Sequence, residues 1–271
     1  MLERIQNTER HILTSAGATV DYGDYLVARS SRYPKWYQAN MMELRVSGGR
    51  SLSDWEQLFH SHFDRTSYQH LMLYIPARKG FEALCDEVDE MTSADQLGAP
   101  PLVVERIVWM FANESRKTAL PEGMEVCRVE LEDDYRDLIE FGVEESTEEP
   151  WFTNRDEVRA YIRSRREVTD RIGVRWYRLS HCGDRRILAR LGIFEYQGIC
   201  RLQAVGTLKS FRGRGLGSAL VNYAIGEALR RGSSGLALSA EADSVAQSMY
   251  LKAEFREVGT DMWLMRYPGS A

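Results

Sequence analysis

The glycine-rich segment at residues 205–220 has the residue types of an anion-binding loop. It reads Val-Gly-Thr-Leu-Lys-Ser-Phe-Arg-Gly-Arg-Gly-Leu-Gly-Ser-Ala-Leu and leads into an amphipathic helix expected at 217–231. Its glycines allow a tight turn and let the backbone approach a ligand without a Cβ in the way. The free N–H groups at the start of the helix, with its dipole, would then bind an anion such as a pyrophosphate. The positive charges of the segment are Lys209, Arg212 and Arg214.

Two common nucleotide-binding loops fit this segment poorly. A P-loop ends in Gly-Lys-Ser or Gly-Lys-Thr, whereas residues 217–219 are Gly-Ser-Ala. The dinucleotide fingerprint belongs to the first strand of a parallel sheet, whereas this loop follows predicted antiparallel hairpins. Nucleotide or dinucleotide binding is therefore only the third alternative for the loop.

The segment resembles the acyl-CoA motif of the GCN5-related N-acetyltransferase superfamily. That motif, Arg/Gln-x-x-Gly-x-Gly/Ala, is matched by Arg212, Gly215 and Gly217. The superfamily usually places a Val-x-Thr or Val-x-Val strand before it, and residues 205–207 read Val-Gly-Thr. The first half of the chain has no such motif at the equivalent place.

A second motif of the superfamily is matched further along the chain. Its pattern is Asn-x-x-Ala-x-x-Leu-Tyr-x-Lys-x-Gly-Phe, and residues 243–255 read Asp-Ser-Val-Ala-Gln-Ser-Met-Tyr-Leu-Lys-Ala-Glu-Phe. Asp243 and Glu254 stand where Asn and Gly are usual. The residues that match in register are Ala246, Tyr250, Lys252 and Phe255.

The resemblance implies that acetyl-CoA is the co-substrate of an acyl transfer to an amine. Backbone N–H groups of 213–218 would hold the pyrophosphate, and main-chain groups of 205–207 would bind the pantetheine arm like an added strand. Tyr250 would be the general acid for the leaving thiolate; the alternative is a core tyrosine with a satisfied hydroxyl. Asp243 would cap its helix. The expected cofactor-binding residues are Val205, Gly206, Thr207, Arg212, Gly213, Arg214, Gly215, Leu216, Gly217, Ser218 and Asp243.

An acidic cluster precedes the aromatic pair Trp151 and Phe152. In the resembled fold this loop borders the acceptor pocket, so an acidic rim would suit a cationic amine; the alternative is a solvated loop. The sequence identifies no general base, and proton loss through water is as good an interpretation. The cluster consists of Glu144, Glu145, Glu148 and Glu149.

The elements that would position these residues follow the order βααβββαβαβ in the second half. Hydrophobic periodicity and turn residues predict them, with Thr153 or Asn154 capping the second helix. Strands are expected at 125–129, 174–180, 186–194, 198–208, 235–240 and 261–267, and helices at 133–141, 155–170, 217–231 and 243–252.

The first half has a similar mixed pattern. Strands are expected at 25–29, 40–46, 70–75 and 102–112, and helices at 52–63, after the cap Ser51, and 81–91. We therefore expect an α/β fold with a mixed, mostly antiparallel sheet flanked by helices, in two acyl-CoA N-acyltransferase-like domains. The expected divisions are a degenerate domain at 1–115, a linker at 116–123 and the acyl-CoA-binding domain at 124–271.

Composition excludes several function classes. The net charge of −5 argues against nucleic-acid or anionic-membrane binding. The 4 Cys form no CxxC pair, so we expect no metal site. The N-terminus is too polar for a signal peptide, and we expect a soluble, cytoplasmic monomer or homodimer. The favoured function is acetyl-CoA-dependent N-acetyltransferase, and the alternative is a non-catalytic acyl-CoA-binding sensor or interaction module.

Overall fold

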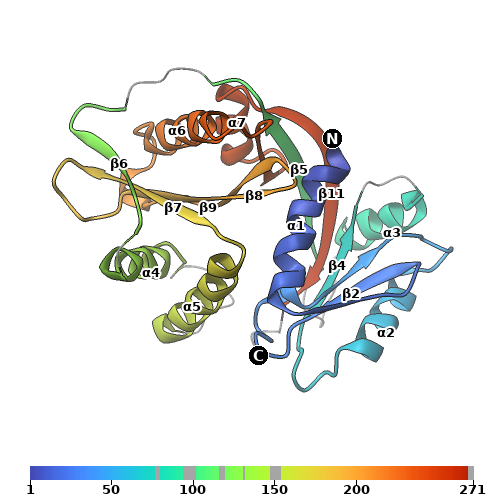
Figure 1. Ribbon diagram of the computed structural model, residues 1–271. Helices are drawn as coiled ribbons and strands as arrows, with labels where there is room; N and C mark the ends of the chain where they lie inside the picture. The colour runs from blue at the N-terminus through green and yellow to red at the C-terminus, as the bar shows by residue number, and fades with distance from the viewer. Residues whose placement is uncertain (77–79, 94–101, 116–119, 131, 147–153, 268–271) are drawn as a thin grey trace. The chain divides into compact units, whose positions relative to one another are not determined.

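The computed structural model describes residues 1–76, 80–93, 102–115, 120–130, 132–146 and 154–267 (Figure 1). It divides into two compact units, each built from two stretches of chain. The first, called here the loop unit, comprises Met1–Ile12 and Trp109–Val258, and the second unit comprises Leu13–Val108 and Gly259–Ala271. These stretches differ from the expected domains at 1–115 and 124–271, because each end of the chain groups with the opposite half. Residues 116–119 of the expected linker lie outside the described residues.

The loop unit is built on a sheet with strand order β10-β9-β8-β7-β6. Neighbouring strands are antiparallel except β9 and β10, which are parallel. The expected βααβββαβαβ order is confirmed, and boundaries differ by a few residues. The strands are β6 (Met124–Arg128), β7 (Arg175–His181), β8 (Ala189–Tyr196), β9 (Ile199–Thr207) and β10 (Leu236–Glu241).

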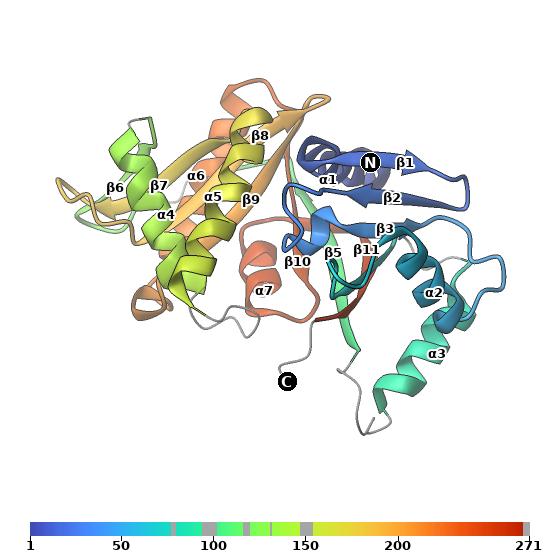
Figure 2. The same ribbon diagram turned by 90° about the horizontal axis from the view of Figure 1, so that it is seen from below.

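Helices cover both faces of this sheet. Figures 1 and 2 show α4 (Glu132–Ser146) and α5 (Arg155–Arg171) on one face and α6 (Leu216–Arg230) on the other. The shorter α7 (Val245–Lys252) follows β10, and the 3-10 turn η2 (Lys209–Phe211) precedes α6. Asn154 caps α5 as predicted, since its side chain accepts a hydrogen bond from the Glu157 N–H at 2.9 Å. The buried contact between α4 and α5 is made by Ile139, Val143 and Val158, with Ile162 against them.

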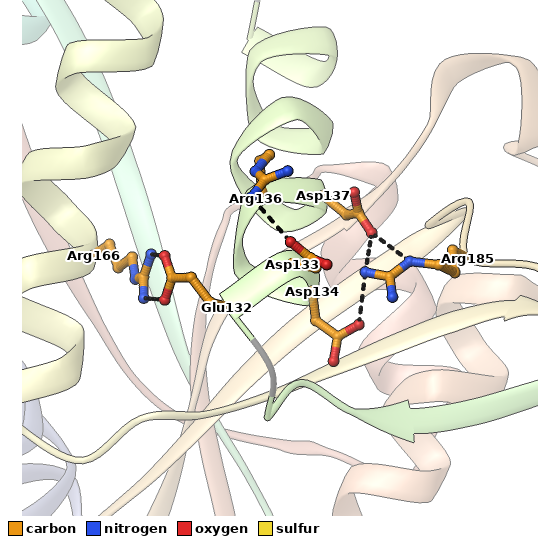
Figure 3. Close-up of polar contacts among 7 residues, drawn as sticks. All are labelled: Glu132, Asp133, Asp134, Arg136, Asp137, Arg166 and Arg185. Carbon is orange, nitrogen blue, oxygen red and sulfur yellow. Dashed lines mark hydrogen bonds and ion pairs between the residues drawn. The ribbon is translucent and has the colours of Figure 1, made fainter.

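Charged side chains fix the start of α4 to its neighbours (Figure 3). Arg166 of α5 donates to both carboxylate oxygens of Glu132, at 3.3 and 3.2 Å. Arg185, which lies between β7 and β8, contacts Asp134 at 3.3 Å and Asp137 at 3.0 Å. The acidic first turn also suits the positive end of the helix dipole. Because exposed ion pairs contribute little energy singly, their role here is to orient α4, whose other end reaches the site described below.

The second unit has its own sheet, with strand order β1-β2-β3-β4-β11. The predicted cap Ser51 begins α2, where Ser51 and Asp54 form a capping box. Figure 2 shows α2 and α3 together on one side of β2 and β3. Large apolar side chains, among them Trp55, Phe59 and Phe63, are fully buried in its core. Its strands are β1 (Ala18–Asp21), β2 (Tyr25–Arg29), β3 (Met41–Leu44) and β4 (Leu71–Ile75), and its helices α2 (Leu52–His62), η1 (Tyr37–Ala39) and α3 (Glu82–Ser93).

Three elements cross the boundaries between the two units, so that part of each belongs to either unit. They are α1 (Leu2–Ala16), β5 (Val103–Ala112) and β11 (Arg256–Arg266). The sequence reasoning did not predict α1 or β1. In the apolar stretch expected at 102–112, burial is complete only from Val108 to Ala112. Among the described residues, no helix has the length and apolarity to cross a membrane.

Candidate functional site

A bulge interrupts β9 just before the glycine-rich loop. Arg190 of β8 pairs with Gly206, and Gly192 pairs with Gln203, so two residues of β9 lie opposite one of β8. The first of them, Ala204, has φ 45, which is unusual for a residue other than glycine. Such bulges disrupt a ladder locally and re-aim the backbone beside functional sites. No feature of the sequence signals it, since alanine is not typical of positive φ.

The predicted glycine turn joins η2 to α6. Gly213 and Gly215 both have φ 76, and a Cβ on either would meet nothing within 4 Å, so the turn is open above its backbone. Gly215 caps α6 without a side-chain hydrogen bond, which leaves the first N–H groups of the helix available to a ligand. A Cβ on Gly217 would lie 3.2 Å from Thr207 Oγ1 and 3.3 Å from Met249 Sδ. Glycine there allows close packing of α6 against β9 and α7.

A cleft of about 580 Å³ lies along this turn and is called here the glycine-loop cleft. It brings together most of the residues predicted from the sequence, and α7 forms its other wall. Arg214 and Asp243 are not among the described residues that line it. Arg212 is fixed beside the turn, since its Nε donates to the Thr207 carbonyl at 3.1 Å. The lining residues are Glu145, Val205, Gly206, Thr207, Phe211, Arg212, Gly213, Gly215, Leu216, Gly217, Ser218, Val245, Ala246, Ser248, Met249, Tyr250 and Lys252.

Tyr250 lies on α7 with only 6% of its surface exposed, yet it borders the cleft. Burial raises the pKa of its phenol to about 12, while the positive charge of Arg201 acts in the opposite direction. The phenol is therefore protonated at neutral pH and can donate a hydrogen bond. Ser244, not Asp243, caps α7: its hydroxyl accepts from the Gln247 N–H at 3.1 Å. The cap expected at Asp243 is wrong, because Asp243 has φ 59 and is one residue outside the helix.

Glu145 is the acidic residue that the structure places in the glycine-loop cleft. It lies near the end of α4, and its carboxylate accepts from Arg190 Nη2 at 3.0 Å. Arg190 is buried, and burial lowers its pKa while Glu145 raises it. The expectation that Glu144 and Glu145 lie in a loop is wrong, because α4 continues to Ser146. Residues 148–152, which hold the rest of the expected acidic and aromatic rim, lie outside the described residues.

A second, polar cavity of about 270 Å³ shares Val205 and Tyr250 with the cleft. It lies between β9 and β10 beyond their parallel pairing, which joins Cys200 to Leu236 and Arg201 to Ala237. The cavity is called here the Arg201 cavity, because that buried guanidinium is in its wall. The sequence reasoning missed Arg201, although a charge within the apolar strand 199–202 was a usable signal. The lining residues are Glu9, Arg165, Arg201, Leu202, Gln203, Ala204, Val205, Leu238, Ser239 and Tyr250.

Comparison with known proteins agrees with this arrangement. Residues 187–264, which include the bulge, the glycine turn and α7, match the sequence model of the FR47-like protein family. The sequence has no significant match among curated proteins.

Several solved structures share the fold over nearly the whole chain. A GCN5-related N-acetyltransferase from Kribbella flavida has a TM-score of 0.67 at 14% identity, covering 100% of this chain and 96% of its own. A functionally unknown conserved protein from Staphylococcus epidermidis has a TM-score of 0.67 at 16% identity, covering 93% and 94%. A tandem GNAT protein from the clavulanic acid biosynthesis pathway has a TM-score of 0.53 at 12% identity, covering 91% and 79%. The chain therefore has the fold of the GCN5-related N-acetyltransferases, and its residues 187–264 match the FR47-like family.

Proposed function

We propose that this protein is an N-acetyltransferase that transfers the acetyl group of acetyl-CoA to an amine. The observation that carries the proposal is the glycine-loop cleft, in which an open αL glycine turn, a bulged strand and a protonated tyrosine face one space. These are the parts that thioester aminolysis requires: an anchor for the pyrophosphate, donors for the thioester oxygen and an acid for the leaving thiolate.

The glycine turn is proposed to hold the pyrophosphate. Gly213 and Gly215 keep their N–H groups clear of side chains, and α6 directs the positive end of its dipole at the turn. Cationic side chains nearby add attraction for a polyanion: Arg212 lines the cleft, and Lys209 joins it in a neighbouring hollow. Residues 205–207 follow the bulge and are proposed to bind the pantetheine arm through main-chain groups.

Tyr250 is proposed as the general acid. The amine nitrogen attacks the thioester carbonyl carbon, an N–C bond forms, the C–S bond breaks and the sulfur leaves with the electron pair. The Tyr250 phenol then gives its proton to the thiolate. The amine loses one proton to solvent, and solvent returns one proton to Tyr250. Glu145 and Glu9 both lie near this path, but each already accepts a hydrogen bond from a buried guanidinium. Water in the open cleft is therefore proposed as the first proton acceptor.

The test is release of CoA thiol from acetyl-CoA by the intact protein across a panel of amines. Turnover that depends on the amine and falls in Tyr250→Phe supports the proposal. Tight acetyl-CoA binding without turnover by any amine would instead identify the alternative, a non-catalytic acyl-CoA sensor. A thermal shift with NAD or ATP but none with acetyl-CoA would point to the nucleotide alternative.

The second unit is proposed to be a catalytically silent copy. The sequence contains one Arg-x-x-Gly-x-Gly loop, at 212–217. Calorimetric titration should therefore find about one CoA per chain, and two equivalent sites would contradict this part of the proposal.

A further inference from the structure

Three spaces of the loop unit adjoin one another in a row. The glycine-loop cleft and the Arg201 cavity share Val205 and Tyr250. The Arg201 cavity in turn shares Arg165, Gln203 and Ala204 with a smaller cavity of about 70 Å³. This smaller space, the α4–α5 cavity, is lined by apolar side chains such as Ile162 and Trp176 together with three arginines. A molecule that meets a thioester at Tyr250 therefore has a polar space directly behind it and a partly apolar space beyond.

The Arg201 cavity and the α4–α5 cavity are lined by more guanidinium groups than carboxylates. Glu9 is the single carboxylate among their described lining residues. Arg166, Arg190 and Arg201 are each paired with a carboxylate, from Glu132, Glu145 and Glu9 respectively. Guanidinium N–H donors still outnumber carboxylate acceptors along the walls of the two cavities, which favours a carboxylate ligand over a cationic one. The guanidinium groups in the two linings belong to Arg165, Arg166, Arg190 and Arg201.

Arg201 is the group best placed to bind a carboxylate. It is 4% exposed, and its Nη2 donates to Glu9 at 2.9 Å and to Ser239 Oγ at 3.0 Å. Its Nη1 donates to the Leu202 carbonyl at 3.2 Å, and its Nε is buried with no partner among the described residues. Since a guanidinium carries five N–H donors, its capacity is not used up. A buried cation with unused donors is costly unless a ligand completes its hydrogen bonds.

We infer that the acceptor of the proposed acyl transfer is a small amine that carries a carboxylate, such as a free α-amino acid. Its carboxylate lies against Arg201 and Arg165, its amine faces Val205 and Tyr250, and its side chain enters the α4–α5 cavity. The amine nitrogen forms the new bond to the acetyl carbon and the C–S bond breaks, giving an N-acetyl amino acid and CoA thiol. This inference rests on the proposed function and names its substrate class.

The same geometry opposes the cationic acceptor that the acidic cluster suggested. Glu144 lines two other hollows, one beside Arg185 and one beside Lys209. Glu145 lines the glycine-loop cleft and is paired with Arg190. Neither carboxylate is among the residues that line the Arg201 cavity or the α4–α5 cavity.

The first experiment compares matched amines in the thiol-release assay with the full chain. Glycine, leucine and phenylalanine are each paired with the amine that lacks only the carboxylate: methylamine, 3-methylbutylamine and 2-phenylethylamine. The carboxylate should raise kcat/KM by about 10- to 100-fold in at least one pair, the effect of a charged hydrogen bond. Equal kcat/KM within every pair, or a preference for spermidine, would overturn the inference.

Variants then assign the effect to the cavity. Arg201→Gln removes the buried charge that is paired with Glu9, and Arg165→Gln removes a half-buried one. Either change should raise the KM for the amino acid by about tenfold or more, and the preference for leucine over 3-methylbutylamine in kcat/KM should fall by a similar factor. Arg163→Gln is the matched control, since Arg163 is exposed on the same helix, α5. If Arg201→Gln does not fold, as circular dichroism would show, Arg165→Gln alone decides.

A binding measurement separates failure of this inference from failure of the proposed function. If no amine releases thiol, the proposed transfer is wrong, and calorimetry with the same amino acids in the presence of CoA becomes the test. Amino-acid binding that weakens in Arg165→Gln but not in Arg163→Gln would still support a carboxylate site. The absence of amino-acid binding to the wild-type chain would overturn it.

Discussion

The carboxylate of Glu145 lies directly over the Cα of Gly206. A Cβ placed on Gly206 would be 2.0 Å from Glu145 Oε1 and 2.7 Å from its Cδ. Gly206 is the cross-strand partner of Arg190, which holds Glu145 through an ion pair of 3.0 Å. Because Gly206 has no side chain, the Glu145 carboxylate at the end of α4 has space beside β9 to pair with the buried guanidinium of Arg190.

Gly206→Ala should displace Glu145 and weaken its pair with Arg190. A buried arginine without its carboxylate partner destabilises the folded state. We therefore expect the free energy of unfolding to fall by about 1–3 kcal/mol, measured by urea denaturation. The sheet itself should persist, because the group in the way is the end of a flexible side chain.

A double-mutant cycle tests this coupling. In a Glu145→Ala background the added Gly206→Ala change has nothing to displace and should cost much less than it does alone. The interaction energy should be about 1 kcal/mol or more. Additive costs would mean that Gly206 and Glu145 are energetically independent.

Gly215→Val should abolish CoA binding while the fold persists. A Cβ at Gly215 meets no protein atom, so the obstacles are its φ of 76 and the intrusion of the side chain into the glycine-loop cleft. Gly232→Val is a close control, because Gly232 has φ 80 and open space but lies beyond the other end of α6. Both variants should lose about 1–2 kcal/mol of stability, and only Gly215→Val should lose CoA affinity in calorimetry. A normal affinity in Gly215→Val would reject the loop assignment.

Tyr250→Phe should lower kcat by about 100-fold with little change in the Kd for CoA, because the phenol acts on charge that appears late in the reaction. Its pKa of about 12 keeps it protonated, so no loss of wild-type activity from its ionisation should appear below about pH 10. The defect of the variant should shrink as pH rises, since a thiolate can leave unprotonated. Tyr223→Phe is the control: burial also raises the pKa of Tyr223, but it is not among the lining residues of the glycine-loop cleft. An unchanged kcat in Tyr250→Phe would mean that Tyr250 only packs in the core and is not the general acid.

The sequence predicted the parts of this fold that depend on local signals. Ser51 and Asn154 cap the helices that they were expected to cap, because an N-cap bond is made within three residues of the cap. The glycine turn was predicted from an equally local signal, since the left-handed backbone there requires glycine. The strand before it was predicted together with the turn. Tyr250 was predicted at the site because its position matches a family motif in register, and it lines the glycine-loop cleft.

Features set by distant parts of the chain could not be predicted in this way. Glu145 enters the glycine-loop cleft only because the end of α4 lies beside Arg190 of β8 and Gly206 of β9. Arg201 forms a cavity wall only because β9 and β10 separate beyond their short pairing. The bulge at Ala204 depends on the register with β8. The grouping of Met1–Ile12 with the second half likewise follows from packing, with Ile5 buried against Trp109 and Phe111.

The second unit carries a buried histidine that gives a separate prediction. His70 is 2% exposed among the rings of Tyr37, Phe59 and Tyr68. Its Nε2 lies 2.9 Å from the Asn40 carbonyl, which fits a neutral ring that donates from Nε2. Burial lowers its pKa from 6.5 to about 4.

A histidine with a depressed pKa in the folded state stabilises the fold above its unfolded pKa, and this contribution is lost as pH falls. The free energy of unfolding should therefore decrease between pH 6.5 and 4, the two pKa values of His70, by up to about 3 kcal/mol. His70→Gln can still donate to Asn40 but takes up no proton, so it should be less stable at pH 7 and much less sensitive to this acid range. Urea denaturation at pH 7, 5.5 and 4.5 measures both effects, and His181→Gln, at an exposed position, should keep the wild-type pH dependence. If His70→Gln loses stability toward pH 4.5 as steeply as the wild-type chain, His70 does not carry the acid sensitivity.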